Sequence, residues 1–409
     1  MASILLKNCS EVVYSKDGKE KVGEALGVVE VLHDVDVLIV DGKFKQVGKD
    51  LDVPFEGVEI LDCAGKAVIP GFVDGHTHPV FDGDRANEFS MKLAGASYME
   101  IHEKGGGIHY TVDQTRNCPE EKLTELCLRR LDQMLSHGTI VAEAKSGYGL
   151  DCETEMKMLR VIKKAKETHP VKIQSTYLCA HAVPPGRDPA EMTKEIVEEH
   201  IPTVAKAGLG VDNIDVFCEK GVYDAEQSRK MLEAGMERGW HVNFHAEELN
   251  YIQGGEMGCE LNARAMSHLE LLSSSAIKSM SQKRIAGVIL PTTAYILKLI
   301  PPPVREMIRE NVIVALGSDF NPNAPCFSMP LVMHLACIIC KMNMEEAFNA
   351  ATINAAYSLG LTDSYGSITE GKVGSCLVLD APSWKHIVYQ LGNHQNLMKN
   401  IIINGRIHS

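Results

Sequence analysis

The middle of this chain contains eight short, almost continuous apolar runs, and longer helical stretches separate them. The runs are Ala67–Val73, Thr139–Ala144, Val171–Ala180, Ile214–Phe217, His241–Phe244, Ala263–Ser267, Ile285–Leu290 and Val312–Gly317. The stretches between them include the expected helices Glu120–His137, Glu153–Thr168, Ala225–Arg238 and Pro303–Glu310. Such runs are typical of strands that are buried on both faces of a parallel sheet. Eight strand–helix units in a row predict an α/β fold, a (β/α)₈ TIM barrel with some insertions.

The two ends of the chain have a different pattern. Near the start, apolar and polar residues alternate between turns, as in Val35–Val40 and Phe44–Val47. Near the end, Gly366–Asp380 and Ile401–Ile407 again have the pattern of short strands. We therefore expect both ends to pack together as a small discontinuous β-sandwich beside the barrel. The predicted domains are 1–68 with 365–409 for the β-sandwich, and 69–364 for the barrel.

Charge and composition exclude several classes of protein. Lysine and arginine total 41 against 54 aspartates and glutamates, a formal net charge of -13, which disfavours binding to nucleic acid or to anionic lipid. We find no apolar run near the roughly 18 residues that a membrane helix needs, and no hydrophobic signal core in Met1–Tyr14. The 12 cysteines are spread singly, without the dense spacing of a disulfide scaffold. We expect a cytoplasmic protein without nucleic-acid or membrane partners.

Titratable residues follow most of the predicted strands. The chemistry of a (β/α)₈ barrel gathers at the C-terminal ends of its strands, so these residues should meet at one mouth. They are His76 and His78 after the first run, His181 after the third, His245 and Glu248 after the fifth, His268 after the sixth, and Asp319 after the eighth.

Four of these residues suggest a metal site. His76 and His78 are two apart, so a continuing strand places both imidazoles on the same side. A lone histidine is more often a core residue, but four such residues at strand ends, with His245 and Asp319, favour a metal. Three imidazoles and one carboxylate suit zinc or iron and leave a position for water.

Eight short motifs contain these residues and their neighbours. They are HTHPVFDGDR (76–85), GGGI (105–108), KSGYGL (145–150), AHAVP (180–184), FHAEE (244–248), SHLE (267–270), LPTTA (290–294) and SDFNPNA (318–324). Together they resemble the imidazolonepropionase family of the amidohydrolase superfamily, and SDFNPNA is similar to the animal form. Residues 37–48 and 366–380 are similar to the strands that bracket the barrel in that superfamily.

The resemblance implies an enzyme of histidine degradation. That family hydrolyses the cyclic amide C–N bond of 4-imidazolone-5-propanoate and gives N-formimidoyl-L-glutamate. It implies one divalent metal ion per chain, zinc or iron, on His76, His78, His245 and Asp319. It also implies that Glu248 activates the water, that His268 polarises the carbonyl or moves protons, and that Asp319 shares in proton transfer.

The resemblance further implies a set of substrate contacts and a homodimer. An acidic protein needs a local cation for the propanoate, and an arginine can hold both carboxylate oxygens. The residues that match substrate-binding positions are Arg85, Tyr98, Tyr148, His181 and Asn321. Many bacterial members have glycine and a hydroxyl residue where Asn323 and Ala324 stand, so the contacts of these two positions are left open.

Two other functions fit parts of the pattern. A deaminase or a cyclic-imide hydrolase would keep the barrel, and binuclear relatives of that kind carry a bridging carboxylated lysine or a glutamate near Glu219-Lys220. A noncatalytic scaffold on the same barrel is disfavoured because all four metal positions, Glu248 and His268 are filled.

Overall fold

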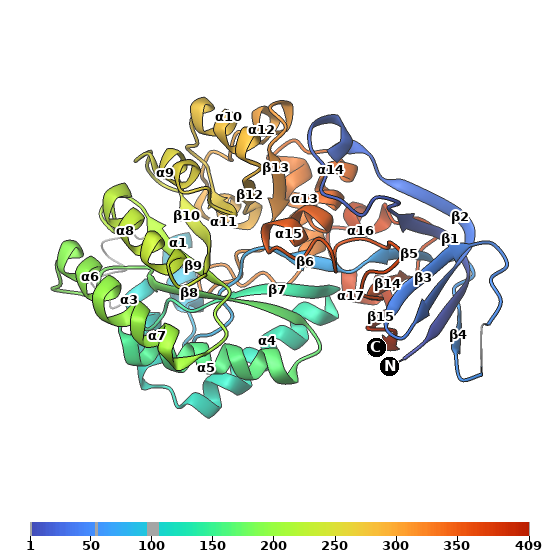
Figure 1. Ribbon diagram of the computed structural model, residues 1–409, viewed down its shortest axis with the longest axis horizontal. Helices are drawn as coiled ribbons and strands as arrows, with labels where there is room; N and C mark the ends of the chain where they lie inside the picture. The colour runs from blue at the N-terminus through green and yellow to red at the C-terminus, as the bar shows by residue number, and fades with distance from the viewer. Residues whose placement is uncertain (1, 54–55, 96–105, 409) are drawn as a thin grey trace.

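The computed structural model describes residues 2–53, 56–95 and 106–408, and its strands form two separate sheets (Figure 1). One sheet has eight parallel strands in sequence order, as the eight apolar runs predicted. Its strands are β6 (Phe72–Asp74), β7 (Thr139–Lys145), β8 (Lys172–Ala180), β9 (Asn213–Cys218), β10 (His241–Ala246), β11 (Ala265–His268), β12 (Ala286–Ile289) and β13 (Ile313–Leu316).

Backbone hydrogen bonds link the segments that follow the first and last of these strands. The amide of His78 donates to the carbonyl of Phe320 over 2.8 Å, and the amide of Asp319 donates to the carbonyl of His76 over 3.0 Å. A parallel bridge joins Thr77 to Phe320 at the same place. The sheet is therefore nearly closed into a barrel, and the closure lies at the ends where function was expected.

Helices surround this sheet (Figure 1). They are α1 (Ala86–Leu93), α3 (Ile108–Asn117), α4 (Glu120–Ser136), α5 (Cys152–Thr168), α6 (Pro189–Glu195), α7 (Ile201–Ala207), α8 (Ala225–Met236), α9 (Gly254–Glu260), α10 (Ser274–Lys283), α11 (Pro291–Leu297), α12 (Val304–Arg309), α13 (Met329–Ile339), α14 (Met344–Ala350), α15 (Ile353–Ser358), α16 (His386–Tyr389) and α17 (His394–Leu397). Local sequence sets several starts, as where Asp151 caps α5 by accepting from the Thr154 amide. None of the helices in the described ranges is long and apolar enough to cross a membrane.

Both ends of the chain build the second sheet. Its strands are β1 (Ile4–Tyr14), β2 (Glu30–Val40), β3 (Lys43–Gly48), β4 (Glu59–Asp62), β5 (Ala67–Pro70), β14 (Cys376–Leu379), β15 (Met398–Ile403) and β16 (Arg406–Ile407). They form one mixed sheet in the order β16-β15-β14-β5-β1-β2-β3, with β4 on β1. Alternate residues such as Val37, Phe44 and Val378 pack into a hydrophobic cluster of their own. The second unit is therefore confirmed, and all its strands are joined in a single sheet.

The first apolar run contributes to both sheets, which its composition did not indicate. Residues 67–70 pair with β1 and β14, and residues 72–74 pair with β7 in the barrel. Gly71 lies between them, where an added Cβ would come 2.5 Å from Ile140 Cγ1. Pro70 and Gly71 thus end one strand and allow close packing at the start of the next. The exact division of the chain into two domains at residues 68 and 365 stays a prediction.

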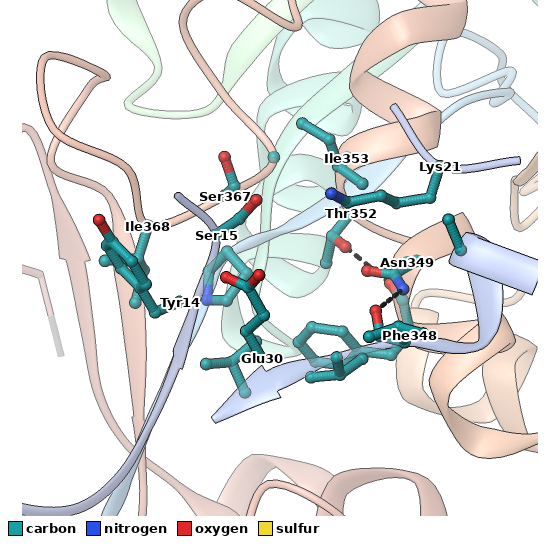
Figure 2. A pocket seen from close by; sticks show the side chains of 16 residues that line it. Tyr14, Ser15, Lys21, Glu30, Phe348, Asn349, Thr352, Ile353, Ser367 and Ile368 are labelled. Carbon is teal, nitrogen blue, oxygen red and sulfur yellow. Dashed lines mark hydrogen bonds between the residues drawn. The ribbon is translucent and has the colours of Figure 1, made fainter. Parts of the chain in front are cut away.

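A small cavity of about 170 Å³ lies where the second sheet meets the barrel helices (Figure 2). Tyr14 and Glu30 line it from the sheet, and Phe348 and Thr352 line it from the opposite side. The Asn349 amide crosses the same junction and donates to the carbonyl of Val28 over 2.9 Å. The strand ends that carry the expected site residues do not line this cavity.

Candidate metal centre and active site

The histidines and the aspartate expected to bind metal meet at the C-terminal end of the barrel. His76 and His78 follow β6, His245 lies in β10, and Asp319 follows β13. All four side chains are buried. His76 Nε2 lies 3.2 Å from His78 Nε2, and each of these atoms lies 3.5 Å from Asp319 Oδ1. The His245 ring centroid is 4.5 Å from that of His76.

These distances fit the residues to a metal ion. The ligand atoms of His76, His78 and Asp319 all lie within 4.8 Å of one another, and so do those of His78, His181 and His245. Two imidazole nitrogens and a carboxylate oxygen that face one another are a donor set for zinc or iron. The structure therefore brings together the four residues that the sequence selected.

Hydrogen bonds to Nδ1 orient the rings of His76 and His245, so that Nε2 of each ring is turned toward the cluster. His245 Nδ1 lies 2.9 Å from Asp215 Oδ1, and His76 Nδ1 lies 2.8 Å from Ser267 Oγ. A carboxylate on Nδ1 fixes the tautomer with a proton there and leaves the Nε2 lone pair free. Sequence reasoning missed Asp215, whose place in β9 resembles that of any polar residue within an apolar run.

Asp215 in turn contacts a buried lysine. Lys145 Nζ lies 2.7 Å from Asp215 Oδ2 and 2.8 Å from Glu143 Oε2, and all three side chains are fully buried. Burial lowers the pKa of Lys145, but Asp215 and Glu143 overcome this and raise it above its usual value. The two carboxylates therefore favour the charged form of Lys145 behind His245.

Burial lowers the pKa of every histidine in the cluster, which favours the neutral form. Burial lowers the pKa of His78 to about 3, and the charge of Lys145 adds to this effect. Burial also lowers the pKa of His268 to about 3, with a smaller contribution from His245. Neutral imidazole is the form that binds a metal ion.

Backbone strain marks the residues around the cluster. Asp319 has a φ of 47°, Glu247 of 56°, and His268 and Leu269 have φ of 74° and 70°. Residues other than glycine rarely adopt these positive φ angles, and such backbone strain is concentrated at functional sites. Thr293 Oγ1 donates to the carboxylate of Asp319 and holds it in place.

Two carboxyl groups lie on the Nδ1 side of His268. Glu248 Oε1 is 3.8 Å from His268 Nδ1, and Glu270 Oε2 is 4.0 Å away. Burial, and then the neighbouring Glu270, raise the pKa of Glu248 well above its usual value. Glu248 and His268 are thus adjacent, as expected, whereas Glu270 was not selected although the SHLE motif contains it.

Aromatic residues expected to contact substrate lie beside the cluster. The His181 ring stacks on that of His78 at 5.0 Å, and the Tyr148 ring lies 5.3 Å from that of His181. Asn321 lies next to Asp319, and its amide donates to the Asp319 carbonyl over 2.7 Å. Tyr98 lies outside the described residues.

Arg85 already has an anionic partner. Its Nε and Nη2 donate to the carboxylate of Glu88 over 2.9 and 2.5 Å. Burial opposes ionisation of Glu88, but Arg85, Lys92 and the Gly107 amide lower its pKa to about 2. Lys92 Nζ also donates to Asn323 Oδ1 over 2.5 Å, which gives Asn323 a contact that the sequence left open.

Two further carboxylates shape the loops of the mouth. Glu155 accepts from the amides of Gly147, Gly149 and Leu150 over 3.0, 2.7 and 3.0 Å. Glu219 accepts from the amide of Leu249, next to Glu248, over 2.8 Å. Glu219 thus supports a loop, and it is absent from the groups of metal-ligating residues found in the described ranges.

Comparisons with known proteins agree with this arrangement. The model of the amidohydrolase family matches residues 67–407. A probable imidazolonepropionase of Danio rerio is 49% identical over 98% of this chain and 96% of its own length. One of Homo sapiens is 46% identical over 99% of this chain and 98% of its own length. The crystal structure of an adenosine deaminase from Xanthomonas campestris with bound zinc superposes with a TM-score of 0.75 and 16% identity, and the match covers 99% of this chain and 92% of that one.

Proposed function

Because this chain belongs to the amidohydrolase family, we propose that it hydrolyses the cyclic amide C–N bond of 4-imidazolone-5-propanoate to N-formimidoyl-L-glutamate, as an imidazolonepropionase of histidine degradation. The observation that carries this proposal is the identity of 46–49% with probable imidazolonepropionases of animals over nearly the whole chain. The buried cluster of His76, His78, His245 and Asp319 supplies the chemistry that a hydrolase of this family needs.

We assign His76, His78, His245 and Asp319 as the ligands of one divalent metal ion, zinc or iron. Such an ion, when bound, lowers the pKa of water and polarises the scissile carbonyl. The ligand atoms of His76, His78 and Asp319 lie close enough to share one ion, and His245 lies within the same reach of both His76 and His78. Asp215 and Ser267 hold the rings of His245 and His76. The count of one ion is supported by Glu219, which accepts loop amides in place of bridging a second metal.

We assign proton transfer to Glu248, His268 and Asp319. Glu248 takes a proton from the attacking water, and burial and the neighbouring Glu270 raise its pKa above the ordinary value of a glutamate, which makes it a stronger base. His268 lies 3.8 Å from Glu248 through Nδ1 and polarises the carbonyl or passes a proton to the departing ring nitrogen. Asp319 Oδ1 lies 3.5 Å from Nε2 of both His76 and His78, so the same carboxylate can bind the metal and share in proton transfer.

We assign the substrate contacts to Arg85, Tyr98, Tyr148, His181 and Asn321. Arg85 donates to Glu88 from Nε and Nη2. The two N–H groups of Nη1 remain for the propanoate carboxylate. The rings of Tyr148 and His181 lie near His78, so they can hold the imidazolone ring above the cluster.

The test is to supply the purified protein with freshly prepared 4-imidazolone-5-propanoate and to measure N-formimidoyl-L-glutamate, with correction for spontaneous decay. We expect turnover that a chelator abolishes and that added zinc or iron restores. Arg85→Gln should raise KM with a smaller effect on kcat, because it removes a contact to the propanoate carboxylate, which is remote from the scissile bond. Turnover of an aminated purine or pyrimidine in place of this substrate would overturn the proposal and favour a deaminase.

We also propose that the protein is a cytoplasmic homodimer. All 12 cysteines are free thiols, which suits a reducing compartment. Exposed apolar side chains of Tyr295, Ile338 and Leu391 line an open groove of about 570 Å³ against α11 and α13, a surface of the kind that partners cover. Light scattering should give twice the chain mass of 44.9 kDa, and Ile338→Glu should shift it to one chain.

A further inference from the structure

Glu270 is a buried carboxyl group without hydrogen bonds. Its side chain is 2% exposed, and neither Oε1 nor Oε2 has a hydrogen-bond partner of normal geometry among the described residues. Buried polar groups in proteins are almost always hydrogen bonded, because an unpaired one costs free energy that the fold must supply elsewhere. The chain therefore keeps Glu270 at a cost to its own stability.

The Glu270 carboxyl group faces a ring nitrogen of His268 that also lacks a hydrogen bond. His268 Nδ1 lies 4.0 Å from Glu270 Oε2, and it too has no hydrogen-bond partner among the described residues. Glu248 Oε1 lies on the same side at 3.8 Å, and Asp319 and Cys340 are the other titratable groups that Glu270 influences. A carboxyl and an imidazole nitrogen that both lack partners are one small movement, or one water molecule, from a hydrogen bond.

The backbone between the two residues is strained in a way that supports this pairing. His268 and Leu269 have φ of 74° and 70°, so the chain turns back immediately after β11. The amide of Leu269 donates to the carbonyl of Ala246 over 3.1 Å, and that of Leu271 donates to Glu247 over 3.0 Å, which holds the turn against the end of β10. This turn places Glu270, two residues further on, beside the imidazole of His268.

We propose that Glu270 is a positioning residue, which accepts the Nδ1 proton of His268 in the working enzyme and so keeps the Nε2 lone pair of that ring directed at the reacting atoms, where it takes up a proton and passes it to the departing ring nitrogen. This inference rests on the proposed function for the role of His268. Glu248 is then free to serve the water, because the Nδ1 side of His268 has its own acceptor. A carboxylate that orients a catalytic imidazole through Nδ1 sets both the tautomer and the angle of the ring.

The alternative is that Glu270 merely supports the fold, and Glu270→Gln separates the two readings. The amide keeps the shape and removes the charge. If Glu270 positions His268, the variant should keep or gain thermal stability and lose kcat by tenfold or more, with KM within about twofold. If Glu270 is structural, the variant should lose stability and keep kcat.

Glu346 provides a matched control of opposite character. It is also a buried glutamate, but it is hydrogen bonded to the Asn343 amide over 2.8 Å and paired with Arg305, and it lies in α14 away from the mouth. Glu346→Gln should lower the melting temperature and leave kcat unchanged. The two variants should therefore fall in opposite corners of a plot of stability against kcat.

A spectroscopic readout keeps the inference testable without turnover. In protein labelled with ¹⁵N-histidine and loaded with zinc, the His268 resonances, assigned with His268→Gln, should report a proton on Nδ1 in the wild type and a mixture of tautomers in Glu270→Gln. An unchanged His268 signal, or kcat within twofold of the wild type, would overturn the inference. If the wild type fails to hydrolyse 4-imidazolone-5-propanoate, the proposed function fails, while the tautomer and the melting temperatures still decide the role of Glu270.

Discussion

At the scale of single residues, the most constrained atoms lie behind the cluster of histidines at the mouth of the barrel. Asp215 Oδ1 accepts from the backbone amide of His245 and from its Nδ1, while Oδ2 accepts from Lys145. Each oxygen of this carboxylate therefore has its own cationic or polar partner. The orientation of His245 depends on a side chain that does not touch the metal position.

Asp215→Asn should weaken metal binding. An amide offers one acceptor oxygen where His245 and Lys145 each need one, so either the ring or the buried cation loses its partner. We expect the affinity for zinc to fall by about 10–100-fold, as is usual when such a supporting residue is removed. Competition with a chromophoric chelator measures it directly.

The control for that measurement is Asp212→Asn. Asp212 precedes the same strand, but it pairs with Lys166 over 2.7 Å and caps the Ser175 amide far from the mouth. Its substitution should leave zinc affinity unchanged. Equal affinities for wild type and Asp215→Asn would show that His245 holds its orientation without this carboxylate.

The sequence identified the residues at strand ends but not those that support them. His76, His78, His245 and Asp319 could be selected because each follows an apolar run, where the fold dictates the position. Asp215 and Glu270 could not, since their roles depend on contacts between neighbouring strands and on a strained turn. The paired state of Arg85 was equally invisible, because an arginine alone does not reveal its partner Glu88.

At the scale of elements, Glu155 of α5 shapes the loop that carries Tyr148. Its two oxygens accept three backbone amides from residues 147–150, and the side chain is fully buried. Gly147, whose carbonyl contacts His181 Nδ1 at 3.0 Å, has a φ of 114°, which favours glycine. One helix side chain thus fixes the loop that lies beside His181 at the mouth of the barrel.

Glu155→Gln should loosen this loop. The amide group would set its own N–H groups against backbone N–H groups, leaving at least one of them unpaired, at a cost of about 1–3 kcal/mol. We expect faster hydrogen exchange at residues 147–150 and a higher KM, while the rest of α5 stays protected. Mass spectrometry of exchange locates the change, and Glu153→Gln, an exposed position of the same helix, should show none.

The bounds of helices and strands were predicted well where the periodicity of the sequence sets them, and poorly where packing against another part of the chain sets them. The helices α4 and α5 lie within one or two residues of the expected ranges. The composition of residues 67–73 could not show that they form two strands in different sheets, because the residues of both strands are buried alike. Only the packing of Gly71 against Ile140 explains where the chain passes from one sheet to the other.

At the scale of the whole molecule, a buried lysine joins the two ends of the chain. Lys372 Nζ donates to the carbonyl of Gly18 over 2.6 Å, and burial lowers its pKa to about 8 from an ordinary 10.5. Between pH 8 and 10.5 the unfolded chain therefore binds more protons here than the folded one. The contribution of Lys372 to stability must rise with pH through this range.

Lys372→Met should remove that dependence. Relative to the variant, the wild type should gain up to about 1.4 kcal/mol per pH unit between pH 8 and 10. Urea unfolding at pH 8, 9 and 10 measures the difference. Lys19→Met changes an exposed position in the same N-terminal loop, and its difference in free energy of unfolding from the wild type should not vary with pH. A difference for Lys372→Met that does not vary with pH would contradict the expectation.

The union of the two ends was predictable as a shared pattern, but the order of the strands was not. Alternating residues at both ends indicated a common β unit. Pairing of β1 with β4 and β5 in parallel and with β2 in antiparallel register depends on long-range contacts that no local pattern specifies.

The position of β5 between β1 and β14 has a consequence for synthesis of the protein. On the ribosome, β1 and β5 emerge early, whereas β14 follows only after the last barrel strand has been made. Until then the edge of β5 that β14 will cover has unpaired backbone groups, and such edges invite association between nascent chains. Chaperones that bind exposed strands would act on this chain during that interval, and mutations that slow barrel formation should lower its yield in cells before they alter the finished enzyme.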